Sequence, residues 1–204
     1  MRKILTIIFL LFAGISWSQQ PKIVSDCTIT YAINSSNASQ QSNLGTKTVY
    51  VKAKDIRTDL VSKTFSQTIF YNSNTGNATV LKTVGDSKYI SSYTAEEWKK
   101  LNAINEGASI EFSQNTKTIL NYQCKEAILT LSNGNMYTIY FIPDIKLSVS
   151  ENPFQFKNVP GLVLQYEAAI NNNEKVIYTA TKIDYNPVPS LQFEIPKTGY
   201  RVLH

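Results

Sequence analysis

The chain of 204 residues has little of what most catalytic sites are built from. It contains a single histidine, His204, and this is its last residue. Histidine is the usual general base near neutral pH, so one terminal histidine argues against Ser-His and Cys-His nucleophile systems. We therefore expect no catalytic residues, and we predict that the protein is not an enzyme.

Metal-binding and phosphate-binding motifs are missing as well. Zinc sites need clustered Cys and His residues, whereas the two cysteines, Cys27 and Cys124, are far apart in the sequence. The eight glycines are spread singly and form neither a G-x-G-x-x-G nor a G-K-[ST] loop. We expect no metal and no cofactor.

The chain also lacks a stretch rich in lysine and arginine. Its formal net charge is +5, but Arg2 and Lys3 belong to the N-terminal segment. Without these two residues, 18 basic side chains face 15 acidic ones, a net charge of +3. Such a balance is ordinary for a protein surface, and we expect no nucleic acid partner.

No apolar run reaches the ~20 residues that a membrane-spanning helix requires. Residues 4–13 form an apolar run between Met1-Arg2-Lys3 and a short segment ending at Ser18, which is typical of a secretory signal peptide. We predict a signal peptide over 1–18, with an uncleaved anchor as the alternative, and a single domain over 19–204. Gln19 stands where a lipoprotein has its lipid-accepting cysteine, so we expect an exported, unlipidated and soluble protein, periplasmic or extracellular.

Alternation of apolar and polar residues dominates the rest of the chain and is typical of strands with one face in the core. In the segment 23–33, Cys27, Ile29, Tyr31 and Ile33 share one parity. Comparable patterns predict strands in 49–53, 56–60, 65–71, 78–84, from 110 onward, 127–131, 136–142, 162–166 and 176–180. The short spacing indicates antiparallel hairpins rather than βαβ units.

One helix is expected within 94–105. Thr94 and Glu97 have the spacing of a capping box, in which each side chain accepts a backbone N–H of the other residue. Trp98 and Leu101 share one face of this helix, and we expect Trp98 to pack against the sheet.

Turn residues divide the second half of the chain. Asn133-Gly134 predicts a type I′ hairpin turn. The strand 136–142 is apolar on both faces, so we place it in the middle of the sheet. Residues 143–160 form a long irregular excursion, a turn is expected at 171–173, and Pro187-Val188-Pro189 is expected to end regular pairing.

Three segments resemble the exported GLPGLI-type proteins of the Bacteroidetes. They are 118–127 (TILNYQCKEA), 137–145 (YTIYFIPDI) and 158–167 (NVPGLVLQYE). The Gly-Leu-Pro-Gly-Leu-Ile segment of that family reads Asn-Val-Pro-Gly-Leu-Val here, matching at Pro160, Gly161 and Leu162. The resemblance implies export and a curved antiparallel sheet like that of lipoprotein carriers, and it implies no reaction.

Together these observations predict a mainly β protein with a single, strongly curved antiparallel sheet, a half-barrel with one short helix packed on it. A β-sandwich is the alternative. Pro160-Gly161 is interpreted as a sharp turn into the strand at Leu162, in which Gly161 supplies a positive φ, or else as a binding motif. Cys27 and Cys124 either form a disulfide or remain two buried thiols.

Two functions are compatible with this fold. In the first, the curved sheet holds an apolar ligand or lipid in a groove, with Trp98, Leu101, Met136, Tyr140 and Ile142 as candidate lining residues. In the second, the protein is an interaction accessory of envelope or secretion machinery that uses sheet edges and the 143–160 excursion to bind another protein.

Overall fold

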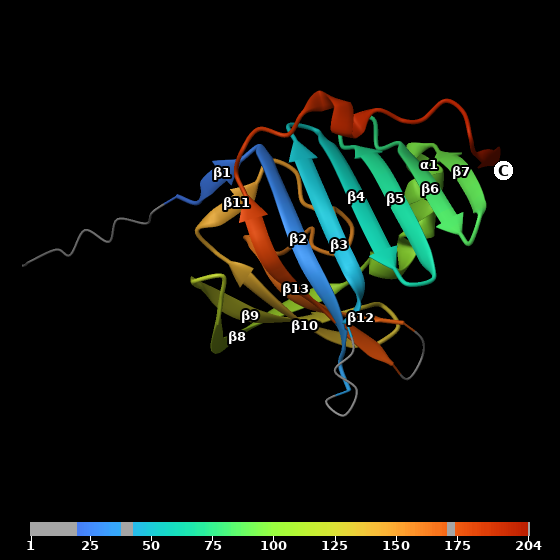
Figure 1. The fold of residues 1–204 in the computed structure, drawn as a ribbon. Coiled ribbons are helices and arrows are strands. Elements are labelled where there is room, and N and C mark those ends of the chain that lie inside the picture. Colours follow the sequence, from blue (N-terminus) through green and yellow to red (C-terminus); the bar gives the residue numbers. More distant parts are fainter. Residues whose placement is uncertain (1–19, 38–42, 171–173, 204) are drawn as a thin grey trace, which may run out of the picture.

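The computed structural model describes residues 20–37, 43–170 and 174–203. The signal peptide expected over 1–18, the turn expected at 171–173 and His204 lie outside these residues. Most of the described chain is β-structure (Figure 1). Its strands are β1 (Lys22–Val24), β2 (Asp26–Ser35), β3 (Asn43–Lys52), β4 (Asp55–Ser62), β5 (Phe65–Asn72), β6 (Ala78–Val84), β7 (Ser87–Tyr93), β8 (Ser109–Ile119), β9 (Tyr122–Thr130), β10 (Met136–Ile142), β11 (Ile145–Leu147), β12 (Leu162–Ala169), β13 (Lys175–Asp184) and β14 (Arg201–Val202).

Twelve of these strands form one sheet in the order β14-β7-β6-β5-β4-β3-β2-β13-β12-β10-β9-β8. The neighbours pair antiparallel, except that β14 runs parallel to β7. The strands at the two ends of this order do not pair with each other, so the sheet stays open. The predicted strongly curved half-barrel with one short helix is confirmed, and its sheet is mixed through β14 alone.

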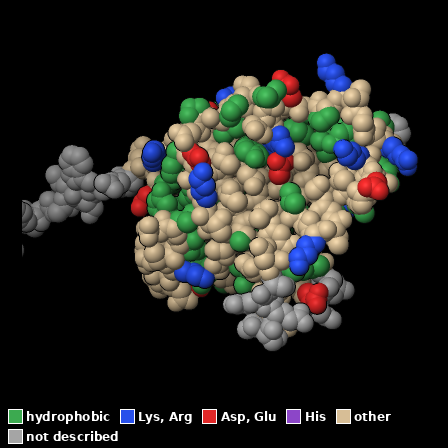
Figure 2. All heavy atoms as spheres, in the orientation of Figure 1, with side chains coloured by type: hydrophobic (Ala, Val, Ile, Leu, Met, Phe, Trp, Pro, Cys, Tyr) green, Lys and Arg blue, Asp and Glu red, His purple; other side chains and the backbone are tan. Residues whose placement is uncertain are grey.

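Side-chain alternation fixes which face of the sheet is buried. Cys27, Ile29 and Tyr31 of β2 are fully buried, and the residues between them are partly exposed. We call the face that carries these residues the inner face. Helix α1 (Ala95–Leu101) and the segment 148–158 lie against it, whereas the outer face carries scattered charged side chains of both signs (Figure 2).

The inner face is filled unevenly. At the start of β12 the core is well packed, and Phe156 of the segment 148–158 lies on Tyr166 with ring centroids 5.0 Å apart. Over β4 and β5, by contrast, the segment and helix α1 cover the sheet without filling the space beneath them. This second region holds the candidate site described below.

Helix α1 begins as its sequence predicts. Thr94 accepts a hydrogen bond from the Glu97 backbone N–H, and the Glu97 carboxylate accepts one from the Thr94 backbone N–H at 2.8 Å. The helix ends at Leu101, and a 3₁₀ turn, Ala103–Asn105, takes over the rest of the predicted range. Trp98 is half-buried and lies beside Tyr93, while Leu101 is exposed.

One hairpin turn differs from the sequence-based expectation, and another was not predicted. Gly134 has φ +83°, but Asn133 does not adopt a positive φ, so the loop before β10 is not the predicted type I′ turn. A backbone bond from Gly134 N–H to Leu131 C=O closes a longer loop instead. The two-residue turn with positive φ at both positions joins β8 to β9 and is made by Leu120 and Asn121, at +50° and +65°.

The turn at Pro160-Gly161 also works by a different mechanism from the one predicted. Gly161 does not have a positive φ. A Cβ atom at this position would lie 2.0 Å from the carbonyl oxygen of Ile142. Glycine is therefore required because two backbone segments approach each other closely, which lets fully buried Leu162 start β12 beside β10.

Regular pairing does not end at Pro187-Val188-Pro189, because β14 still pairs with β7. Between Pro189 and β14, the chain runs across the ends of the strands from β3 toward β7 (Figure 1). The Val188 C=O accepts a hydrogen bond from Lys52 Nζ, and the Gln192 C=O accepts one from Arg57. These two partly buried side chains thus hold the C-terminal segment to the sheet.

Cys27 and Cys124 are two buried free thiols in this structure. Burial raises the pKa of Cys27 to about 12 and that of Cys124 to about 11. Both thiols therefore stay protonated and unreactive at neutral pH.

Candidate functional site

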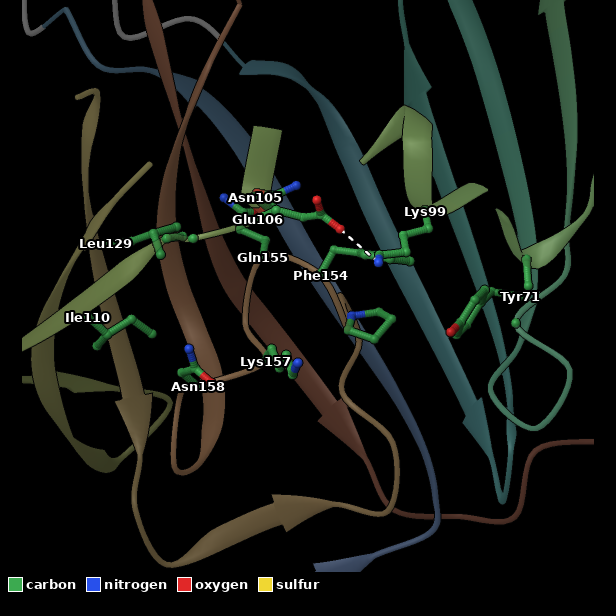
Figure 3. A pocket seen from close by; sticks show the side chains of 15 residues that line it. Tyr71, Lys99, Asn105, Glu106, Ile110, Leu129, Phe154, Gln155, Lys157 and Asn158 are labelled. Carbon is green, nitrogen blue, oxygen red and sulfur yellow. Dashed lines mark ion pairs between the residues drawn. The ribbon is translucent and has the colours of Figure 1, made fainter. Parts of the chain in front are cut away.

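Two neighbouring cavities lie between the inner face and the segment 148–158. The larger, of about 520 Å³, is bordered by α1, the start of β8 and residues 153–158. In Figure 3, Ile110 and Leu129 lie at one end of this large cavity and Tyr71 lies at the other. The Lys99–Glu106 ion pair, at 3.1 Å, spans its rim (Figure 3).

The smaller cavity, of about 280 Å³, lies over β3, β4 and β5. It shares Tyr71 and residues 153–155 with the large cavity, so the two are separated only by this part of the covering segment. Most of its wall is apolar or aromatic, contributed by Ile56, Leu60, Ile69, Trp98 and Phe154.

Lys47 is the unexpected member of this wall. It lies on β3 at the parity of Val49 and Val51, which faces the core, and only 6% of the residue is exposed. Its Nζ donates a hydrogen bond to Tyr166 Oη at 2.9 Å. The same nitrogen lies 5.4, 5.1 and 5.8 Å from the ring centroids of Tyr31, Tyr166 and Tyr178. Such distances give favourable cation–π attraction.

These three rings form what we call the tyrosine cage. Tyr166 stacks on Tyr178 with centroids 4.5 Å apart and meets Tyr31 edge-on at 6.1 Å. The Tyr31 hydroxyl donates to the Val163 carbonyl at 2.9 Å. Burial raises the pKa of Tyr31 and Tyr166 well above the ordinary value, so both remain neutral phenols. The cage therefore holds a cation without adding a negative charge.

Glu151 brings the opposite charge to the same cavity from the segment 148–158. It is 6% exposed, and its Oε1 has no hydrogen-bond partner. Burial raises the pKa of Glu151 to about 7, although the positive charge of Lys47 acts in the other direction. Burial likewise lowers the pKa of Lys47 to about 8, which the Glu151 charge opposes. The desolvation effect is the larger one for both groups.

No direct ion pair joins Lys47 to Glu151 among those found in the described residues. The small cavity therefore contains two buried groups of opposite charge, each with unused hydrogen-bonding capacity. No cluster of three or more potential metal ligands occurs in the described part of the chain.

Of the five groove residues proposed from the sequence, only Trp98 lines one of these two cavities. Leu101 is 60% exposed and Met136 is 55% exposed. Tyr140 donates its hydroxyl to Glu126 at 2.5 Å, and Ile142 is buried in the core. The structure does not bring the five side chains together.

Sequence reasoning missed Lys47, Glu151 and the tyrosine cage. A signal for Lys47 was present, because the residue has the same parity as Val49 and Val51 on a strand with one buried face. Nothing comparable marks Glu151, which lies in an irregular segment whose course depends on the whole fold.

Comparison with known proteins gives a fold but no family. No protein-family model matches this chain, and no curated protein matches it. PNGF-II, solved in a C2 space group, aligns with 86% of this chain at a TM-score of 0.52 and 14% identity. This chain spans 30% of the PNGF-II chain, and the similarity shows a shared fold alone.

A LolA superfamily protein from Nitrosomonas europaea aligns with 88% of this chain and 92% of its own, at 10% identity and a TM-score of 0.34. That superposition is too loose to bear on the fold or the function. Among the helices of the described residues, none has the length and apolarity needed to cross a membrane.

Proposed function

We propose that the protein is an exported, non-enzymatic binding protein that carries an apolar ligand between the inner face of its sheet and the segment 148–158. The observation that carries this proposal is the pair of adjoining cavities, of about 520 and 280 Å³, beneath one covering segment. Small-molecule sites typically measure roughly 300–1,000 Å³ and have mostly apolar walls with a few polar groups. The GLPGLI-type resemblance agrees with this proposal in implying export and no reaction.

The direct test is to look for the ligand. The protein purified from its native host is analysed by native mass spectrometry and by organic extraction, and the delipidated protein is titrated with an environment-sensitive apolar dye. We expect a copurifying apolar molecule and saturable dye binding by the folded protein. Repeated absence of both would overturn the proposal.

A cavity-filling substitution ties any binding to this place. Ala108 lines the large cavity, whereas Ala103 is exposed and lines neither cavity. Ala108→Trp should weaken dye binding by about tenfold or more, equivalent to about 1.4 kcal/mol. Ala103→Trp, the matched control, should leave it unchanged. Equal binding by the two variants would place the dye elsewhere.

A second function, binding of an extended segment of an envelope protein, is supported by the free edge of the sheet. β8 has a neighbour on one side only, and its Phe112 is 57% exposed beside a cavity of about 400 Å³ that Pro143 and Pro160 also line. An unpaired edge of this kind can accept another strand. A photo-crosslinker at position 112, used in the native host, should capture one defined partner, and recovery of free monomer alone would count against this function.

A further inference from the structure

The polar groups of the small cavity indicate which kind of ligand head it accepts. A lysine ammonium has three N–H donors. Lys47 uses one of them, toward Tyr166 Oη, and the Oε1 of Glu151 accepts none. Buried charged groups are expensive to leave unsatisfied, so an additional group that bonds to both would stabilise the site.

A hydroxyl group has the required chemistry. Its oxygen can accept from the ammonium of Lys47 while its hydrogen is donated to the carboxylate of Glu151. A carboxylate head would place a second negative charge beside Glu151, and an ammonium head would place a second positive charge beside Lys47. Because these two buried charges already balance, a neutral head adds no uncompensated charge.

We propose that Lys47 and Glu151 bind the hydroxyl group of a neutral amphiphile, such as a monoacylglycerol or a long-chain alcohol, whose hydrocarbon chain fills the apolar remainder of the two cavities. This inference rests on the proposed function and names its ligand class. Oε1 of Glu151 is covered in this structure. Its bond to the ligand therefore forms once the Glu151 side chain turns or the segment 148–158 lifts.

The first experiment compares three amphiphiles that have hydrocarbon chains of the same length and different head groups. Delipidated wild-type protein with a bound apolar dye is titrated at pH 7.5 with 1-monooleoylglycerol, oleic acid and oleylamine. We expect 1-monooleoylglycerol to displace the dye about tenfold more effectively than the two charged probes. A preference of this size corresponds to the free energy of one charge-assisted hydrogen bond. Equal displacement by all three probes would overturn the hydroxyl site and would mean that only water binds at Lys47 and Glu151. The proposed carrier function would not be affected by that result. Absence of dye binding altogether would instead overturn the carrier function.

The second experiment changes the charge of the site. In Glu151→Gln the lysine loses its counter-charge, so the preference should shift toward oleic acid. In Lys47→Met the carboxylate remains, so the preference should shift toward oleylamine. Lys100→Met is the matched control, because Lys100 is exposed on α1 and lines neither cavity. It should keep the wild-type order of the three probes.

An unchanged order in both Glu151→Gln and Lys47→Met would overturn the proposal, provided that circular dichroism shows both variants folded. If Lys47→Met does not fold, Glu151→Gln alone decides, and an unchanged order of the three probes in that variant overturns the proposal.

Discussion

At the residue scale, the molecule is distinguished by two charges that it buries at some cost. Desolvation penalises each of them, and neither is fully hydrogen-bonded. A protein that needed only a stable core would be better served by apolar residues at both positions. Lys47 and Glu151 are therefore more readily understood as parts of a binding site than as parts of the core.

Glu151 should make stability depend on pH. Its folded-state pKa is raised from the ordinary 4.5 to about 7, so its contribution is fully present below pH 4.5 and is lost as the pH rises through 7. Relative to Glu151→Gln, the wild-type free energy of unfolding should fall by on the order of 3 kcal/mol between pH 4.5 and pH 7. Urea titrations of both proteins across this range measure the difference. Glu111→Gln, at an exposed position, should follow the wild-type curve.

The two charges should also be energetically coupled. At pH 8, Lys47→Met alone leaves the Glu151 carboxylate buried without compensation and should cost about 3–5 kcal/mol of unfolding free energy. The double variant Lys47→Met/Glu151→Leu should regain most of that loss, because it replaces both charges by apolar groups. Chemical denaturation of the single and double variants completes a double-mutant cycle. Additive losses would show that the two groups act independently.

At the element scale, the alternation of apolar and polar residues predicts the strands. It does not predict where two backbone segments approach each other closely. The pattern in 23–33 identifies β2 and its buried face, and Thr94 with Glu97 identifies the start of α1. The turn at Leu120-Asn121 was missed because a leucine gives no signal of a positive φ, and an asparagine alone is too common a signal to mark a two-residue turn. The role of Gly161 was misjudged because the carbonyl of Ile142 comes from a different part of the chain.

The two kinds of glycine constraint can be separated by mutation. A Cβ at Gly161 would meet the Ile142 carbonyl oxygen at 2.0 Å, and backbone cannot move aside easily. Gly161→Ala should therefore cost on the order of 3 kcal/mol or more and displace β12 from β10. At Gly85, φ is +56° and nothing lies within 4 Å of the added atom, so Gly85→Ala should cost only about 1–2 kcal/mol. Thermal unfolding of both variants tests this order, and equal losses would contradict it.

At the scale of the whole molecule, the sheet forms a rigid frame. Helix α1 and the segment 148–158 form a cover that is held less firmly. β2 has two paired neighbours and a fully buried inner row, whereas α1 has no buried residue. The segment 148–158 contributes Phe156 to the core, but it also contains Glu151, whose carboxyl oxygen is unsatisfied. These contacts favour local opening of the cover without unfolding of the frame. The sequence predicts the frame well, since it depends on local alternation, and it predicts the cover poorly, since that depends on where distant segments meet.

Hydrogen exchange should resolve this division. In the delipidated protein we expect amides of α1 and of the segment 148–158 to exchange at least about tenfold faster than those of β2 and β13, because they open locally rather than by global unfolding. Saturation with 1-monooleoylglycerol should slow exchange in α1 and in 148–158 and leave β2 unchanged, since the ligand lies beneath the cover and touches the frame only from inside. Mass spectrometry of peptides from both regions measures the effect. Protection spread evenly over all strands would mean that the ligand stabilises the protein globally and that the cover does not move as a separate unit.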